Sequence, residues 1–545
     1  MKPLDQQHEF ANDSSTNSSP SDATSYVRLV DLPPAPATET QLRLRTNAGP
    51  DVYLPRDWKR ADAGPADYSL WRIESIAIPI TYIYTGILLS FPTAYMEYFP
   101  RQLGASDAQL NTIKVVRALP WTFKVVFGVF PDNFPLRGKR FKPYLLLGCV
   151  TSSFFHMLLC IADTSLTVVS FTLLLLGAMV GIVMADVMSD AIVAHRILSR
   201  HEVVPGHTQS IVYMCRFLSE MAGYWLGAVL SNREHWGFGI SMSQQFGFLA
   251  VFPLFTVIPS IWLLSEPTVT SVASVHEQVA SLWVMLQRRA TWQPVGFLVL
   301  VNAFLVHNAA WGNYLKVAFH FDAFQYGAMA AIGASVTFVA IFVYREFIMD
   351  RFHSPWHFVY FITGAVIAIF STLNVLLVLG VSTRLHISPF WFAVGDAAVV
   401  SFAKGFQYLP LAIMFVAVCP ENQEGVAFAL LTSITNLAHA FANTISNMLL
   451  RLWPVELVDL ERHEYAGVWK LSILTSVIPL LPLVFTTRLL PAGKQQQSDM
   501  MNEMSRRGGT AVICFYVFGL VWVLALSILA VVRPCHFLVG GRGCS

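Results

Sequence analysis

Thirteen hydrophobic stretches constrain the fold of this 545-residue chain more than any other feature. A hydrocarbon core about 30 Å thick is crossed by roughly 20 apolar residues in helical conformation, which matches the length of these stretches. Charged residues make up only 13% of the chain, whereas a soluble domain carries roughly 25%. We therefore expect an all-α, polytopic membrane protein. The predicted spans are 75–97, 108–131, 143–162, 166–190, 208–231, 245–265, 293–312, 326–344, 357–380, 389–418, 424–450, 468–488 and 511–532.

The longest connection between these spans follows the sixth one and separates two groups of six helices, with one extra helix at the C-terminal end. A bundle of six plus six helices is typical of secondary transporters, although such an outline does not by itself establish function. We expect five regions: a disordered cytosolic N-terminal tail (1–74), an N-terminal six-helix bundle (75–265), a cytosolic central loop (266–292), a C-terminal six-helix bundle (293–490), and a segment with a linker, a thirteenth transmembrane helix and a short tail (491–545).

The loops between the spans differ in their content of Lys and Arg, which sets the orientation of a membrane protein. With the N-terminus in the cytosol, the tail and cytosolic loops hold 22 Lys and Arg residues, and the outer loops hold 8. We therefore expect a cytosolic N-terminus. No transit-peptide composition is visible, so we expect a plasma membrane or endomembrane location.

Several classes of function are disfavoured. A formal net charge of +2 offers little phosphate neutralisation, which argues against a nucleic-acid partner. The seven cysteines contain no Cys-x-x-Cys pair, so we expect no metal. We find no phosphate-cradling glycine loop or nucleophile elbow, and we expect neither an enzyme nor a cofactor. The expected partners are a small-molecule substrate, protons and the lipid bilayer.

The second span leads into a loop that combines an acid, a glycine and a basic cluster. These residues are Asp132, Arg137, Gly138, Lys139 and Arg140. An acid at a helix end can pair with a nearby arginine or with a neighbouring helix, and such a pair can open and close as two bundles rock. We therefore predict a cytosolic gate motif. The alternative is a simple positive-inside anchor.

Ionisable residues inside the spans are candidate functional residues, because a charge that faces lipid costs at least about 2.5–3.5 kcal/mol. Asp186 and Asp190 share one helical face, and two close carboxylates discourage simultaneous ionisation, which suits a proton relay. The alternative places Asp190 in solvent at the cytosolic helix end. Arg117 and Lys124 also share a face, with Pro120 between them. Such a basic face suits a carboxylate-bearing solute, whereas Lys124 could instead snorkel to the cytosol.

Two further pairs complete the set of candidate residues. Arg216 and Glu220 lie four positions apart in the fifth span, where an internal ion pair would make each charge tolerable. Asp396 and Lys404 lie eight positions apart in an otherwise apolar span and are expected to face the protein interior rather than lipid. All eight residues are therefore predicted to bind substrate or couple transport, although structural ion pairing explains Arg216 and Glu220 equally well.

Three sequence blocks resemble one known family. The segment 120–144 contains Pro-Trp-x-x-Lys, Gly-x-x-x-Asp and Arg-Gly-x-Arg. Its loop resembles the connection between helices two and three of the major facilitator superfamily, and the fuller pattern resembles the folate-biopterin transporter family within it. The Asp-rich block 185–193 and the Cys-Pro…Glu-Gly…Phe-Ala-Leu block 419–431, followed by Ser433 and Asn436, are similar to the same family.

This resemblance implies a secondary active transporter of folate or pterin-like solutes that works by alternating access, with proton coupling expected. It covers neither the N-terminal tail nor the thirteenth span. Two alternatives stay open: a major facilitator carrier for another organic anion or a nucleoside-like solute, and a non-transporting membrane receptor.

Overall fold

A computed structural model describes most of the chain from residue 70 onward. The described residues are 42–44, 52–54, 70–103, 107–162, 165–200, 207–231, 236–266, 268–269, 274–321, 323–352, 355–420, 423–533 and 536–539. The chain separates into two units, Met1–Tyr68 and Ser69–Ser545.

The first unit contains a short antiparallel strand pair. Strand β1 (Leu42–Leu44) pairs with β2 (Val52–Leu54), with Leu42 opposite Leu54. This pair differs from the disorder expected throughout 1–74. In β2, Val52 and Tyr53 favour extended backbone. The other residues of 1–68 lie outside the described ones.

The second unit is built almost entirely from helices. Those of the predicted N-terminal bundle are α1 (Ala77–Ser90), α2 (Thr93–Gln102), α3 (Asp107–Thr122), α4 (Lys124–Asn133), α5 (Lys142–Ile161), α6 (Val168–Arg200), α7 (His207–Leu230), α9 (Met242–Phe255) and α10 (Val257–Leu263). The predicted central loop contains α11 (Val275–Gln287), which begins with a capping box between Ser274 and Glu277.

The predicted C-terminal bundle and the segment after it contain the remaining helices. They are α12 (Arg289–Ala303), α13 (Trp311–Phe319), α14 (Ala323–Val343), η3 (Tyr344–Phe352), α15 (Trp356–Ser371), α16 (Leu373–Val378), α17 (Val381–Arg384), α18 (Pro389–Val418), α19 (Glu424–Leu449), η4 (Leu450–Leu452), α20 (Leu457–Glu461), α21 (Ala466–Val477), η5 (Ile478–Phe485), α22 (Thr486–Leu489), α23 (Lys494–Asp499), η6 (Met500–Asn502), α24 (Arg506–Val532) and η7 (Phe537–Val539).

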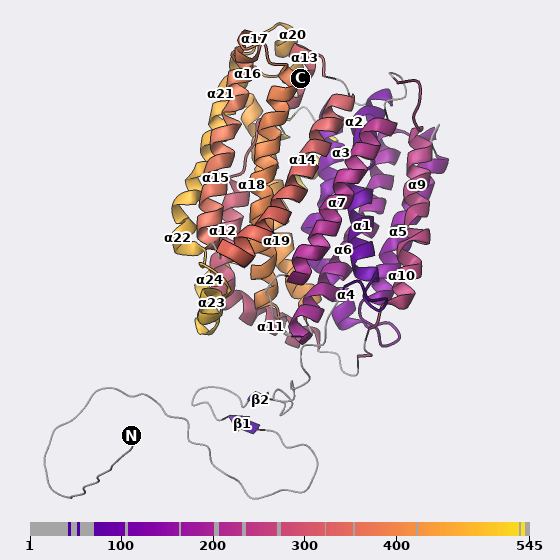
Figure 1. Ribbon diagram of the computed structural model, residues 1–545, viewed down its shortest axis with the longest axis vertical. Helices are drawn as coiled ribbons and strands as arrows, with labels where there is room; N and C mark the ends of the chain where they lie inside the picture. The colour runs from indigo at the N-terminus through magenta and orange to yellow at the C-terminus, as the bar shows by residue number, and fades with distance from the viewer. Residues whose placement is uncertain are drawn as a thin grey trace, which may run out of the picture. The chain divides into compact units, whose positions relative to one another are not determined.

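The all-α, polytopic fold class is confirmed. Among the described residues, nine helices are long and apolar enough to cross a membrane. The expected spans 75–97, 108–131, 208–231 and 293–312 also fall on helices, but these are broken or carry charges. In Figure 1 the indigo and magenta helices gather on one side of this unit and the orange ones on the other. The exact division into two six-helix bundles stays a prediction.

Close helix packing at small residues brings α5 against α6. A Cβ on Gly148 would lie 2.8 Å from the Ala185 backbone nitrogen, and one on Gly181 would lie 2.4 Å from the Ser152 nitrogen. Because neither glycine can gain a side chain without moving a neighbouring backbone, the two helices meet at their closest along this stripe. This contact fixes the position of α6, which carries Asp186 and Asp190.

Candidate functional site

A break between α3 and α4 directs Lys124 into the protein. Pro120 lacks an N–H group, and Phe123 at the junction has φ −105° and ψ 17°, outside helical geometry. Lys124 therefore begins a new helix. Its side chain is only 4% exposed, so it does not snorkel to the cytosol.

Lys124 and Arg216 share one carboxylate. The Lys124 Nζ donates to Asp186 Oδ2 at 2.5 Å, and Arg216 Nη1 donates to Asp186 Oδ1 at 2.7 Å. The Lys124 ammonium also lies 3.5 Å from Asp190 Oδ2. Helices α4, α6 and α7 thus contribute to one ion network, which is buried from solvent.

The network extends at both ends. Arg216 Nε donates to Glu220 Oε1 at 3.1 Å, which confirms the predicted pair within α7. The Tyr82 hydroxyl of α1 donates to Asp190 Oδ1 at 2.7 Å, so Asp190 is buried rather than solvated at a helix end. Because removal of one partner leaves an uncompensated buried charge, each member of such a network constrains the others.

Aromatic rings surround this network. The Lys124 Nζ lies 4.8 Å from the centre of the Trp121 ring, and the Arg216 guanidinium carbon lies 5.7 Å from it. Tyr213 of α7 packs edge-to-face on Tyr408 of α18 at 4.8 Å between ring centres. Cations over an aromatic face are stabilised by its quadrupole, and these rings also offer surfaces for a flat solute.

A cavity of about 370 Å³ lies between α7, α14 and α18. Glu220 and Tyr224 line it from α7, Thr337 lines it from α14, and Ser401 lines it from α18. Glu220 therefore belongs to the ion network and also lines this cavity between the two predicted bundles.

A second group of ionisable residues is basic. The Lys404 ammonium of α18 acts electrostatically on the imidazoles of His307 and His439, and Lys114 of α3 acts on His307. These four side chains come from α3, α18, α19 and the segment after α12, and all four residues are exposed. We call Lys114, His307, Lys404 and His439 the basic group.

Asp396 lies in the predicted C-terminal bundle and has a neutral partner. Asn374 Nδ2 of α16 donates to Asp396 Oδ2 at 3.0 Å, while the buried Oδ1 has no hydrogen-bond partner within the part of the chain described. Lys404 and Asp396 act on each other electrostatically but form no ion pair among the described residues.

Arg117 does not join the ion network. Its Nη2 donates to the Leu89 carbonyl of α1 at 3.0 Å, close to the Phe91-Pro92 break that separates α1 from α2. The break at Phe123 changes the helix direction between Arg117 and Lys124, so their seven-residue spacing does not bring them to one partner. This differs from the shared basic face expected from spacing alone.

The gate motif forms a buried latch with α19. Arg140 Nη2 pairs with Asp132 Oδ1, and Asp132 Oδ2 accepts from the Val426 backbone N–H at 3.0 Å. Glu424 Oε2 lies 3.6 Å from Arg140, and Glu424 Oε1 lies 3.2 Å from His195 Nδ1. Burial raises the pKa of Asp132, while the Arg140 guanidinium opposes that shift. Of the partners expected for Asp132, Arg140 and a neighbouring helix are present.

The other gate residues shape the loop. Leu136 and Lys139 exchange both backbone hydrogen bonds, at 3.0 and 3.1 Å, across Arg137 (φ 53°) and Gly138 (φ 72°). Two successive positive φ values define a tight turn that favours glycine at one position. Lys139 Nζ donates to the Glu266 carbonyl at 2.5 Å, so the turn is also tied to the segment after α10.

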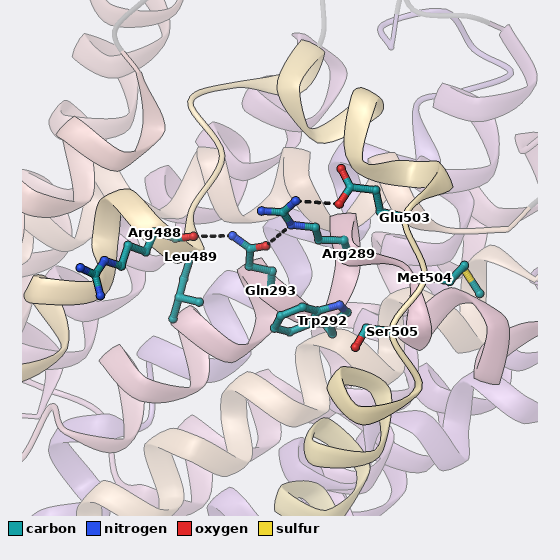
Figure 2. A pocket seen from close by; sticks show the side chains of 8 residues that line it. All are labelled: Arg289, Trp292, Gln293, Arg488, Leu489, Glu503, Met504 and Ser505. Carbon is teal, nitrogen blue, oxygen red and sulfur yellow. Dashed lines mark hydrogen bonds and ion pairs between the residues drawn. The ribbon is translucent and has the colours of Figure 1, made fainter. Parts of the chain in front are cut away.

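Another cavity, of about 430 Å³, lies where α12, α22 and the segment before α24 meet (Figure 2). Arg289 Nη1 pairs with Glu503 Oε2 at 2.6 Å, and Gln293 Nε2 donates to the Arg488 carbonyl at 2.5 Å. Figure 2 shows the Arg488 guanidinium pointing away from these groups. None of the predicted site residues lines this cavity.

Sequence reasoning identified the charges of the network but missed its surroundings. It singled out no aromatic residue and neither His307 nor His439. Trp121 stands inside the Pro-Trp-x-x-Lys motif and Glu424 inside the Glu-Gly block, so both signals were present. The contribution of the histidines depends on tertiary contacts that no local pattern shows.

The helical architecture, the ion network between spans and the latch define this chain as an integral multi-pass secondary transporter of the major facilitator type. The chain belongs to the BT1 family, whose sequence profile matches residues 86–507.

Named relatives agree with this assignment. The chain is similar to a folate-biopterin transporter of Synechocystis sp., at 24% identity over 78% of this chain and 83% of the relative. It is also similar to the probable folate-biopterin transporter 2 of Arabidopsis thaliana, at 23% identity over 77% and 82%. A further relative is the folate transporter 1 of Plasmodium falciparum, at 22% identity over 72% of this chain and 74% of the relative.

Solved structures support the fold alone. A D-xylose–proton symporter has a TM-score of 0.52 at 12% identity, over 77% of this chain and 97% of that structure. A human organic anion transporter has a TM-score of 0.50 at 15% identity, over 76% and 99%. At such low identity, similarity of fold carries no information about substrate.

Proposed function

We propose that this transporter carries a folate or pterin-like organic anion by alternating access and that a proton gradient drives the transport. The observation that carries the proposal is the presence of two charged groups, the basic group and a buried, carboxylate-containing ion network that lies beside the Trp121 ring. The relatives named folate transporters support the substrate class.

The basic group and the ion network have different roles in this proposal. The basic group supplies cations for the carboxylates of the solute, and the aromatic side chains supply surfaces on which a pterin ring stacks. In the ion network, Lys124 and Arg216 hold Asp186, while Asp190 and Glu220 are the carboxylates that gain and lose the transported proton. A cation that releases one carboxylate and binds another can exchange protons without exposing a bare charge.

The latch supplies the gate of this cycle. Asp132 binds the first turn of α19, and Arg140 neutralises it, so the ends of α4 and α19 are held together. Alternating access requires one bundle to rock against the other around a central site, and the latch must then open. We place this end of the molecule on the cytosolic side, with the N-terminus, in a plasma membrane or endomembrane, because the Lys and Arg bias favours that orientation.

Uptake by reconstituted vesicles tests the proposal. Radiolabelled folate and biopterin are supplied to vesicles that contain the full chain, with and without an imposed pH gradient, and an Asp186→Asn vesicle serves as the control. We expect saturable uptake that the gradient stimulates. Saturable uptake without stimulation would contradict proton coupling only, whereas no saturable uptake of either compound would contradict the substrate class.

A competition panel refines the substrate. Unlabelled organic anions and nucleoside-like solutes are added during folate uptake, and inhibition constants are compared with those of folate and biopterin. We expect folate or biopterin to compete best. A different anion that competes more strongly would assign the same scaffold to that solute.

A further inference from the structure

The break between α3 and α4 leaves several backbone groups without helical partners. Phe123 N–H bonds the Pro120 carbonyl at 3.2 Å and Val126 N–H bonds the Phe123 carbonyl at 2.9 Å, so both use three-residue turns. A continuous α-helix would join the Val126 N–H to the Thr122 carbonyl and the Val125 N–H to the Trp121 carbonyl. The break therefore releases the Trp121 and Thr122 carbonyls and the Val125 N–H.

Side chains from two other helices bind these three groups. The Val125 N–H donates to Ser433 Oγ at 3.0 Å, and Asn436 Nδ2 donates to the Trp121 carbonyl at 3.3 Å. The Tyr516 hydroxyl donates to the Thr122 carbonyl at 3.1 Å. Ser433 and Asn436 belong to α19, whereas Tyr516 belongs to α24. An unsatisfied backbone group at membrane depth is costly, so a broken span requires such neighbours.

Helix α24 is packed on α19 and so holds Tyr516 in place. Trp522 Nε1 donates to Thr444 Oγ1 of α19 at 2.9 Å, and the Trp522 ring lies 5.7 Å from that of Phe441. A Cβ on Gly519 would lie 2.8 Å from the Leu437 side chain, which shows how closely the helices approach. The family match ends at residue 507, immediately after α24 begins.

We propose that Tyr516 of the extra C-terminal helix is a positioning residue for transport: with Ser433 and Asn436 it fixes the break that presents Trp121 and Lys124 to the ion network. We call these three residues the helix-break clamp. The break lies between Trp121, which stacks near both cations, and Lys124, which binds Asp186. A shift of the backbone at Thr122 therefore moves both side chains at once. The effect on transport rests on the proposed role of Lys124. The structural claim, that the helix-break clamp fixes the break, does not.

Tyr516→Phe tests this assignment because it removes one hydroxyl and keeps the ring. Thr444→Val is the matched control, since it removes a different side-chain hydrogen bond between α24 and α19 but leaves the break untouched. The purified full-length proteins are treated with a small amine-reactive reagent in lipid nanodiscs, and modification of Lys124 is measured by mass spectrometry relative to Lys142.

We expect Lys124 to be modified about fivefold faster in Tyr516→Phe, which is the change in equilibrium that the loss of one hydrogen bond produces. In Thr444→Val we expect the native rate. Normalisation to Lys142 separates this effect from general unfolding. Equal rates in Tyr516→Phe and the native protein would overturn the proposal, as would equal acceleration in both variants. The measurement needs no substrate, so it stands whether or not folate is transported.

Transport kinetics provide the functional readout. In the vesicle assay Tyr516→Phe is expected to lower the maximal rate and to shift its pH profile, while KM stays near the native value, because the clamp acts on Lys124 and not on the basic group. A pH profile that is unchanged, together with faster Lys124 labelling, would contradict the link between the break and coupling. If no native uptake is found, only the proposed function fails.

Discussion

The ion network is largely buried, whereas the four residues of the basic group are exposed, and the charge balance of the two groups is opposite. In the network, Lys124 and Arg216 contact three carboxylates, those of Asp186, Asp190 and Glu220. In the basic group, Lys404 acts electrostatically on His307 and His439, Lys114 acts on His307, and Asp396 is hydrogen-bonded to Asn374.

This difference separates two physical tasks. Two cations and three carboxylates balance when one carboxyl is protonated, so the network is stable without a ligand and is suited to exchanging protons among its own members. Lys404 has no carboxylate within ion-pair distance among the described residues, so an incoming anion can compensate its charge, which suits substrate capture. The comparison predicts that substitutions in the network impair coupling and folding, whereas substitutions in the basic group impair affinity.

The largest effect is expected from Asp186→Asn, which removes the carboxylate shared by Lys124 and Arg216. Breaking a buried pair costs about 3–5 kcal/mol, so we expect uptake to fall by more than about 100-fold. Ser189→Ala on the same helix is the control. The double variant Asp186→Asn with Lys124→Gln restores the charge balance and should recover thermal stability but not uptake. Native-like uptake by Asp186→Asn would contradict the role of the network.

Lys404→Gln should affect affinity. Loss of one cation from the basic group is expected to raise KM for folate by about tenfold, equivalent to about 1.4 kcal/mol, with little change in maximal rate. Lys470→Gln removes an exposed lysine of α21 that lies near Trp469 and serves as the control. Initial uptake rates over a range of folate concentrations measure both constants. A fall in maximal rate at constant KM would contradict the assignment of substrate affinity to the basic group.

Arg140→Gln extends the comparison to the latch. Asp132 would keep its bond to Val426 but lose its cation. Burial raises the pKa of this carboxyl, and Arg140 would no longer lower it. We expect α4 and α19 to separate more often, so that maleimide labelling of the buried Cys419 rises about fivefold, as for loss of a charge-assisted bond. Arg137→Gln, in the same turn, should leave labelling unchanged. Peptide-level mass spectrometry distinguishes Cys419 from the exposed Cys514.

The smallest effect on rate is expected from Glu220→Gln. Glutamine keeps an acceptor for Arg216 and occupies the same space, so uptake without a gradient should stay within about twofold of the native rate. Stimulation by an imposed pH gradient should disappear, because the carboxyl at the cavity wall can no longer take up a proton. Retained stimulation would remove Glu220 from the coupling residues and leave a structural ion pair.

Sequence alone determined the membrane character of this protein, its helical spans and the identity of its buried charges. Hydrophobic stretches of sufficient length can fold only as helices in lipid, and the pair Arg216 and Glu220 follows from helical spacing. The Asp132, Arg-Gly and Lys-Arg pattern likewise predicted a gate loop. Each of these features depends on residues that are close in sequence.

Tertiary structure decided which charges meet. Spacing placed Arg117 beside Lys124, but the break at Phe123 sends Lys124 to Asp186 while Arg117 bonds to the Leu89 carbonyl. His307 and His439 join Lys404 only because three separate elements converge. Contacts between distant segments depend on how whole helices pack and bend, and a single broken turn redirects a side chain that local periodicity places elsewhere.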